Sequence, residues 1–248
     1  MNTKEVRDFI YIPETDSTNN ALKLMSENEY LPSGSIVYTD FQTAGRGQRG
    51  NSWESEANKN LLFSILLCNT DVPANISFVI SEMMSLCVKY TLEKYISDIT
   101  VKWPNDIYHK DKKIAGILIE NTILQGKVSQ SIAGIGINVN QVKFLSNAPN
   151  PVSMTQITNK TYNITTIIQD FHEIFTDQSK LISSKCFDLI HNEYLKHIYR
   201  KNVLHKYRDE TGVFEAVIHD IEPAGCLVIK RIDGTFSRYA FKEISFLL

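Results

Sequence analysis

The stretch QTAGRGQRGNSWESEANKNLLFSILLC (residues 42–68) decides between the folds that its glycines suggest. Gly45, Gly47 and Gly50 match the G-x-G-x-x-G dinucleotide fingerprint, in which a helix opens on the glycines and crosses back to a parallel strand. Only the ten residues 51–60 separate the glycines from the apolar run 61–68. A crossover needs at least ~10–12 residues including its helix, so the sequence argues against a Rossmann fold.

The same loop also misses the P-loop pattern, because Asn51 stands where that pattern requires lysine. Two guanidiniums, Arg46 and Arg49, stand among the glycines instead and favour direct ion pairing with anionic oxygens. The glycines would then supply mobility and close backbone approach. The alternative is a solvated surface loop, which Trp53 makes less attractive because a large aromatic beside a mobile loop can fold over a ligand.

The composition is that of an ordinary globular chain of 248 residues, 43% hydrophobic and 22% charged. This length fits one large domain, or one large and one small domain. The net charge of -2 argues against broad, non-specific binding to nucleic acid. The cysteines are scattered, which is typical of reduced residues in a cytoplasmic protein. The amino terminus has charges where a signal peptide needs an apolar run, and no apolar run reaches 18 residues. The sequence therefore predicts a cytoplasmic protein outside the membrane. The histidines show no zinc-ligand spacing.

Periodicity and turn residues predict the order of the elements. Strands are expected at 9–12, 34–40 and 61–68, and helices at 16–28, 76–96 and about 165–197. The β-forming segments 99–108, 112–123 and 128–140 have short polar spacers between them, which is typical of antiparallel hairpins. From about Leu204 short strands alternate with turn signals, which indicates a small β-barrel-like unit that leans on the main domain.

KWPNDIY (102–108) places polar groups next to a proline that does not fit the interior of a central strand. Asn105 and Asp106 would therefore project from a strand end toward a site, with Asp106 as a carboxylate for magnesium or a ribose. An ordinary Pro-Asn-Asp turn is the alternative. In DKKIAGILIE (111–120) the alternation of a strand favours Lys113, on the face of Ala115 and Ile117, as the residue that faces a pocket. A pair of solvated hairpin lysines remains the alternative.

GIGINVN (134–140) puts Gly134, Gly136 and Asn138 on one face of a strand. That face could form the floor of a narrow slot, although tight packing against a helix is the slightly preferred explanation. This strand could also lie at an exposed edge of the sheet and pair with a second copy, so monomer and homodimer both stay open. DSTN (16–19) is either a plain helix cap or a set of hydroxyls and N–H groups that binds a polar ligand.

Together, DSTN, QTAGRGQRGNSW, KWPND, KKIAGIL and GIGINV occur in the order found in biotin protein ligases, and the chain resembles that family over most of its length. The resemblance implies an α+β fold with a mixed, largely antiparallel sheet and packed helices, like a class II synthetase, over residues 1–200. The tail is similar to the family's small SH3-like domain, here 201–248. Because the pattern starts within the first 20 residues, the resemblance is to the non-regulatory type without a DNA-binding module.

The resemblance implies that ATP and biotin, with Mg²⁺, give biotinyl-5′-AMP, and that biotin then passes to one lysine of a biotin carboxyl carrier protein or domain. Family roles carry over by matching position. The biotin contacts would be Ser17, Thr18, Asn19, Gln42, Gly45, Arg46, Gly47, Lys113 and Gly116. The ATP and adenylate contacts would be Arg46, Arg49, Trp53, Asn105 and Asn138, and the catalytic residues Lys113, Arg46, Arg49 and Asp106, with Asp106 as the candidate metal ligand. Gln48 stands where some members have arginine, so that contact does not carry over.

Two other functions remain for comparison. Lipoate–protein ligases or octanoyltransferases share the fold but are expected to have a different glycine signature. A non-catalytic ligand-binding or DNA-regulatory protein would have no need of Lys113, Arg46 and Arg49 together.

Overall fold

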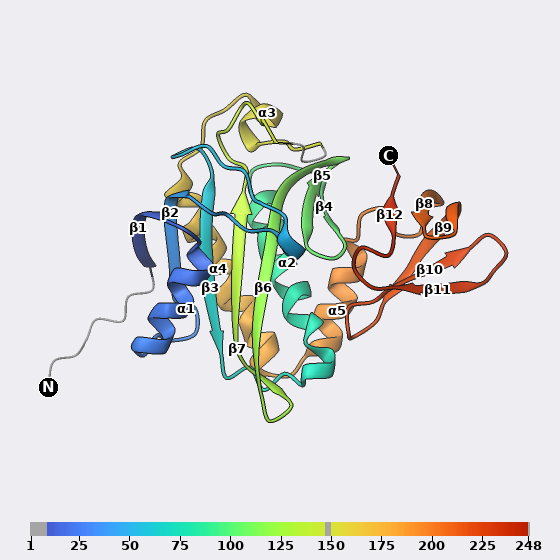
Figure 1. Ribbon diagram of the computed structural model, residues 1–248, viewed down its shortest axis with the longest axis horizontal. Helices are drawn as coiled ribbons and strands as arrows, with labels where there is room; N and C mark the ends of the chain where they lie inside the picture. Colours follow the sequence, from blue (N-terminus) through green and yellow to red (C-terminus); the bar gives the residue numbers. More distant parts are fainter. Residues whose placement is uncertain (1–8, 147–149, 248) are drawn as a thin grey trace, which may run out of the picture.

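The computed structural model describes residues 9–146 and 150–247. A seven-stranded sheet forms the centre of the molecule, and a smaller five-stranded sheet lies beside it (Figure 1). The first sheet contains β1 (Phe9–Thr15), β2 (Ile36–Gln42), β3 (Leu61–Cys68), β4 (Ile99–Lys102), β5 (Asp106–His109), β6 (Lys112–Leu124) and β7 (Lys127–Ile137). The second contains β8 (His205–Asp209), β9 (Gly212–Ile221), β10 (Leu227–Arg231), β11 (Phe236–Tyr239) and β12 (Ser245–Phe246). The helices are α1 (Thr18–Asn28), α2 (Phe78–Glu93), α3 (Met154–Thr158), α4 (Ile164–Ser183) and α5 (Phe187–Lys196), with short 3-10 turns η1 (Gln48–Gly50) and η2 (Ala74–Ile76).

The first sheet has the strand order β1-β2-β3-β7-β6-β5-β4. Only β1 and β2 run parallel, and every other neighbouring pair is antiparallel. The predicted α+β fold with a mixed, largely antiparallel sheet is therefore confirmed. No crossover helix follows the loop that carries Gly45, Gly47 and Gly50 (the glycine loop), since β2 and β3 are antiparallel neighbours. The chain between them is free to form a loop over the end of the sheet.

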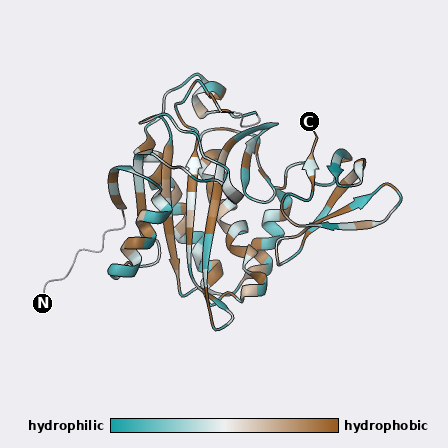
Figure 2. Cartoon of the chain, in the orientation of Figure 1, coloured by the Kyte–Doolittle hydropathy of each residue, from teal (hydrophilic) through white to brown (hydrophobic). Residues whose placement is uncertain are grey.

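Both faces of the first sheet are covered by helices (Figure 1). α1 packs on one face, where Leu22 meets Val37, Leu66 and Ile132 in a small apolar cluster. α2, α4 and α5 cover the other face and build the main core. Because β3 is buried on both faces, its sequence is almost continuously apolar, and the middle strands are mostly brown in Figure 2 while the connecting loops are mostly teal or white.

The hairpins expected between 99 and 140 are present, since β4, β5, β6 and β7 pair in sequence order. Pro104 lies between the end of β4 and the start of β5, in agreement with its predicted place at a strand end, and the Trp103–Pro104 peptide bond is cis. The suggestion that the glycine strand lies at an exposed edge is wrong. β7 lies between β3 and β6, and β1 and β4 form the two edges of the sheet.

The helical segment expected at about 165–197 is present as α4 and α5, which meet at residues 184–186. Lys185 adopts a left-handed backbone conformation there, with φ 57°, so the chain turns between the helices. In the part of the chain that the structure describes, no helix is long and apolar enough to cross a bilayer.

The C-terminal β unit expected from about residue 204 is an antiparallel five-stranded sheet in the order β11-β10-β9-β8-β12. Its β9–β10 turn docks on the first domain. The Trp103 indole N–H donates to the Gly225 carbonyl at 2.9 Å, and the Phe78 ring lies against Gly225. The domain boundary at residue 201 and the SH3-like classification stay predictions.

Candidate functional site

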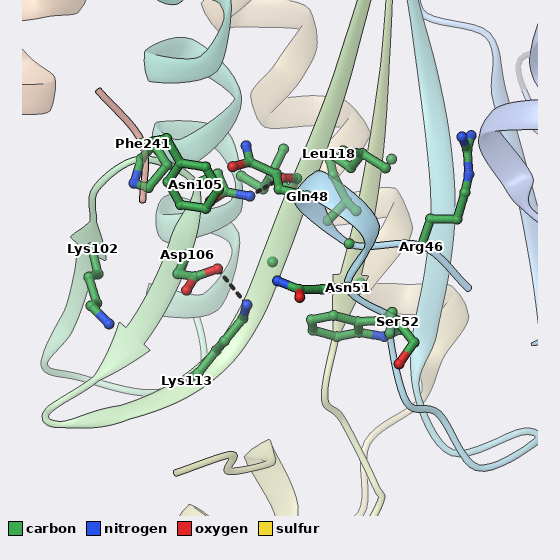
Figure 3. Close-up of a pocket in the computed structure, with 18 of the residues that line it drawn as sticks. Arg46, Gln48, Asn51, Ser52, Lys102, Asn105, Asp106, Lys113, Leu118 and Phe241 are labelled. Atoms are coloured by element: carbon green, nitrogen blue, oxygen red, sulfur yellow. Dashed lines mark hydrogen bonds and ion pairs between the residues drawn. The ribbon is translucent and has the colours of Figure 1, made fainter. Parts of the chain in front are cut away.

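A cavity of about 570 Å³ opens on the α1 side of the sheet, beneath the glycine loop. It is large enough for a drug-sized ligand. Most of the side chains expected at the site line it, although they come from segments far apart in the sequence (Figure 3). The predicted residues in its lining are Ser17, Thr18, Asn19, Gln42, Arg46, Gly47, Trp53, Asn105, Asp106, Lys113 and Gly116.

One end of the cavity is a polar network at the amino terminus of α1. The Gln42 Oε1 atom accepts the Thr18 backbone N–H at 2.8 Å and the Thr18 hydroxyl at 3.1 Å. The Ser64 hydroxyl contacts Thr18 Oγ1 at 2.7 Å and Asn19 Oδ1 at 2.6 Å. Ser17 is the N-cap residue of α1, but its hydroxyl makes no capping bond. Among the described residues its backbone N–H donates to Asp16 and its carbonyl accepts the Ala21 N–H, whereas its hydroxyl makes no hydrogen bond, so the buried hydroxyl is available to a ligand.

Glu120 connects this network to the glycine loop. Its Oε2 atom accepts the Asn19 amide at 2.7 Å and lies 3.2 Å from Arg46 Nη2. Arg46 also donates to Asn20 Oδ1 at 2.8 Å. The Arg46 and Glu120 side chains are 41% and 42% exposed, so the pair holds the loop by no more than about 1 kcal/mol. The loop is therefore docked but weakly held.

Two backbone hydrogen bonds close the base of the glycine loop. The Trp53 N–H donates to the Gly45 carbonyl at 2.9 Å, and the Gly47 N–H donates to the Asn51 carbonyl at 2.6 Å. A Cβ on Gly45 would come within 2.8 Å of the Trp53 carbonyl oxygen, so a side chain there would break this closure. Gly45 thus shapes the loop but does not line the cavity.

Glycines on β6 and β7 form the floor of the cavity, as the sequence suggested for Gly134 and Gly136. Gly116 pairs with Gly136 across the two strands, and the indole of Trp53 lies on both. A Cβ on Gly136 would stand 2.5 Å from Trp53 Cε2, and one on Gly116 would stand 2.9 Å from Cζ3. Only glycine fits beneath this ring, so the floor and Trp53 act as one unit.

Lys113 and Asp106 form an ion pair in the cavity, with 2.5 Å between Nζ and Oδ1 (Figure 3). Simple strand alternation had placed Lys113 on the face of Ala115, and this is wrong. The β5–β6 register shifts after Ile107, so that Ile107 pairs with Ala115 and Tyr108 with Lys113. The bulge turns Lys113 to the side of Gly116, where Nζ lies 3.3 Å from the position of a Cβ.

Asn105 fixes the turn that carries Asp106. Its side-chain amide donates to the Ile117 carbonyl at 2.5 Å, and its own carbonyl accepts the Ile117 N–H at 3.0 Å. Beyond Asp106 lies Lys102, whose Nζ donates to the Tyr108 hydroxyl at 2.9 Å. Burial lowers the pKa of Lys102 and raises the pKa of Tyr108, and nearby Asp106 opposes the first shift and adds to the second.

Besides Gly45, two predicted site residues do not line the cavity or cannot be placed there. Asn138 is buried, and its side chain donates to the Val152 carbonyl at 3.2 Å rather than lining the cavity. The Arg49 side chain lies outside the part of the chain that the structure describes. Their predicted nucleotide contacts therefore stay predictions.

Sequence reasoning missed the residues that the C-terminal sheet contributes. The segment after β11 returns to the cavity and lines the side that faces Lys102. Its lining residues are Phe241, Lys242, Ile244, Ser245 and Phe246. Glu120 and Ser64, which hold the polar end together, were also missed. No local motif marks any of them, because their role depends on which strands become neighbours.

The residues present do not form a resident magnesium site. Among the described residues, Asp106 is the only carboxylate in the lining, and its Oδ1 atom is paired with Lys113. Within residues 9–146 and 150–247 no group of three or more His, Cys, Asp or Glu side chains is placed to hold a metal ion. Magnesium commonly binds through one or two carboxylates plus substrate phosphates. A magnesium ion at Asp106 would therefore need further oxygen ligands from a bound phosphate.

The fold and the cavity together define an α+β domain that encloses a small molecule between a glycine loop and a glycine-bearing sheet. The chain belongs to the Biotin/lipoate A/B protein ligase family, whose sequence model matches residues 11–138. The bifunctional ligase/repressor BirA of Escherichia coli is 37% identical over 129 residues, which are 52% of this chain and 39% of that protein. The biotin–[acetyl-CoA-carboxylase] ligase of Mycobacterium tuberculosis is 30% identical over 139 residues, 54% of this chain and 50% of that protein. The chain therefore spans half or less of these relatives.

The solved structures extend the likeness over nearly the whole chain. The biotin protein ligase from Aquifex aeolicus in complex with biotin and ATP has a TM-score of 0.77 and 25% identity. The match covers 96% of this chain and 97% of that one. The C-terminal sheet is therefore included in the shared fold.

Proposed function

We propose that this protein is a biotin–protein ligase, which activates biotin with ATP and transfers it to a lysine of a biotin carboxyl carrier protein or domain. The observation that carries the proposal is the single cavity that combines a polar end, a glycine floor under Trp53 and the Lys113–Asp106 pair. The likeness to a biotin ligase that holds biotin and ATP supports the same reading.

The polar end of the cavity favours biotin over lipoate. Biotin ends in a ureido ring with two N–H donors and a carbonyl acceptor, whereas the dithiolane ring of lipoate has no strong hydrogen-bonding group. Ser17, Thr18 and Gln42 offer hydroxyl and amide groups of matching kind at that end. A lipoyl ring would leave the buried Ser17 hydroxyl without a partner, and such a mismatch discriminates between ligands.

The first step joins two anions, so it needs positive charge at the junction. A carboxylate oxygen of biotin attacks the α-phosphorus, and the bond from that phosphorus to the oxygen bridging to the β-phosphate breaks. Biotinyl-5′-AMP forms and pyrophosphate leaves. Lys113 and Arg46 offset the charge that develops there, and Asp106 positions the Lys113 ammonium. Arg49 would add a second guanidinium from the same loop.

The second step transfers the biotinyl group. The neutral amine of the acceptor lysine attacks the acyl carbon, the bond to the phosphate oxygen breaks, AMP leaves and the amine loses a proton. Mixed anhydrides hydrolyse readily, so the loop that carries Arg46 and Trp53 protects the intermediate by excluding water. Residues 1–200 would form the catalytic domain, and the C-terminal sheet would be an SH3-like domain that completes the wall of the cavity.

Purified protein with MgATP, biotin and a biotin carrier domain tests this function. The expected product is a carrier that streptavidin detects, and formation should require both ATP and biotin. Lipoate and octanoate in place of biotin provide the matched comparison. If the carrier accepts lipoate or octanoate and not biotin, the chain is a lipoate or octanoate ligase of the same family and the proposal is wrong.

A further inference from the structure

Lys102, the last residue of β4, extends into the cavity on the far side of Asp106 from Lys113 in the view of Figure 3. Its Nζ atom donates to the Tyr108 hydroxyl at 2.9 Å and lies 4.8 Å from the centre of that ring. The Phe246 ring of the C-terminal sheet lies 5.3 Å from the same atom. The ammonium is thus held between two aromatic rings that belong to different sheets.

Lys102 lacks the carboxylate partner that two other cations in the cavity lining have. Arg46 has Glu120 at 3.2 Å, and Lys113 has Asp106 at 2.5 Å. No carboxylate of the described residues lies within ion-pair distance of Lys102. Burial lowers its pKa; the negative charge of Asp106 opposes this shift, and the positive charges of Lys113 and Arg200 add to it. Lys102 is half-buried, and a half-buried cation without a carboxylate partner gains stabilisation when an anion binds beside it.

The position of Lys102 indicates which anion it meets. The ammonium of Lys113 lies beside Gly116 and 5.5 Å from the centre of the Trp53 ring, so it faces the glycine floor. Lys102 lies on the other side of Asp106, toward the C-terminal sheet. With the acid on the floor and its carboxylate at Lys113, the α-phosphate must also reach Lys113. The remaining phosphates then extend toward Lys102.

We propose that Lys102 binds the β- and γ-phosphates of ATP and stabilises the departing pyrophosphate. This inference rests on the proposed function, because it requires ATP as the co-substrate. When the bond between the α-phosphorus and the bridging oxygen breaks, the electron pair and its negative charge stay on pyrophosphate. The Lys102 ammonium then forms a charge-assisted hydrogen bond with that anion, while Tyr108 and Phe246 hold the side chain in place.

Calorimetry can separate this role from a general structural one. It compares the affinities of wild-type protein and Lys102 variants for ATP, pyrophosphate, AMP and biotin. Lys102→Met should weaken the binding of ATP and pyrophosphate by roughly 10- to 100-fold, the range for one lost charge-assisted hydrogen bond. AMP and biotin lack the β- and γ-phosphates, so their binding should stay within about threefold of wild type. Lys102→Arg should keep most of the ATP affinity. Lys112→Met, which removes an exposed lysine of the neighbouring hairpin, is the matched control and should behave as wild type.

Equal losses for AMP and ATP, or an unchanged affinity for pyrophosphate, would overturn the role of Lys102. If Lys102→Met does not fold, as judged by thermal unfolding, Lys102→Gln replaces it, because Gln keeps a hydrogen-bond donor toward Tyr108. Failure of the proposed function gives a different result. Wild-type protein would then bind ATP without binding biotin, while the difference between ATP and AMP at Lys102 would persist.

Discussion

The indole of Trp53 lies on the backbone of Gly136, so closely that a Cβ on Gly136 would come within 2.5 Å of Cε2 and 2.7 Å of Nε1. The same Nε1 atom is enclosed and has no hydrogen-bond partner among the described residues. An aromatic ring therefore takes the space that a side chain on β7 would occupy. This contact explains why β7 has glycine at position 136, opposite an aromatic residue far away in the sequence.

Gly136→Ala should displace the Trp53 ring and destabilise the protein by about 1–3 kcal/mol, the usual effect of overpacking. Chemical denaturation measures this loss. The contact predicts that the loss nearly disappears when Trp53→Ala is already present, because the three atoms nearest to the new methyl group all belong to the Trp53 ring. An equal loss from Gly136→Ala in both backgrounds would show that the ring is not the reason for the glycine.

Lys113→Ala should lower biotin-dependent pyrophosphate exchange by at least ~100-fold, because it removes a positive charge from the developing adenylate. The free energy of unfolding should change by only ~1 kcal/mol, since the Lys113 and Asp106 side chains are both partly exposed. Lys112→Ala removes the adjacent, exposed lysine and is the control for the loss of one charge. A Lys112 variant as inactive as the Lys113 variant would remove the specific role of Lys113.

The contrast between these two lysines shows how far sequence reasoning reaches. Local patterns were sufficient for the hairpins. For GIGINVN they left the floor of a slot and packing against a helix both open, and they singled out Lys113 over Lys112. The route to that choice was wrong, because the bulge after Ile107 depends on how β5 pairs with β6. Strand alternation assumes an unbroken register between paired strands. The bulge breaks that register, so alternation could not predict that Lys113 and Gly116 lie on the same side of the sheet.

The C-terminal contribution to the cavity was out of reach for a different reason. Residues 236–248 were recognised as part of a small β unit, which their turns and strand residues specify locally. That Phe246 comes within 5.3 Å of the Lys102 ammonium depends on the docking of one sheet on another. Such docking is set by contacts such as that between Gly225 and Phe78, which no local periodicity records.

His191 should make the stability of this docking depend on pH. The ring lies 2.8 Å from buried Glu82 on α2 and 3.5 Å from Asp220 on β9, and the hydrogen bond to Glu82 raises the pKa of His191. A raised folded-state pKa gives stability that is fully present below the unfolded-state pKa, ~6.5 for histidine, and that is lost as the pH rises through the folded-state value.

His191→Gln should therefore reduce the free energy of unfolding more at pH 5.5 than at pH 9, by a difference on the order of 1 kcal/mol. Urea denaturation at both pH values measures it. His219→Gln is the matched control, because His219 contacts the Phe236 ring and no carboxylate among the described residues. The same pH dependence in both variants would refute the assignment to the His191–Glu82 contact.

Gly225 should matter more than its position in a surface turn suggests. It has φ 91°, a conformation that favours glycine, and its new Cβ in Gly225→Ala would stand 2.7 Å from Phe78 Cδ2. Gly234, at φ 87° in the β10–β11 turn, has nothing within 4 Å of the corresponding position. Both alanine variants therefore carry a similar backbone penalty of about 1–2 kcal/mol.

Only Gly225→Ala also pushes the C-terminal sheet away from α2, which should add about 1–3 kcal/mol to its loss. Denaturant titration of both variants, with limited proteolysis to detect release of the C-terminal sheet, tests this difference. Equal stability and equal protease resistance would mean that the Gly225–Phe78 contact does not hold the two sheets together.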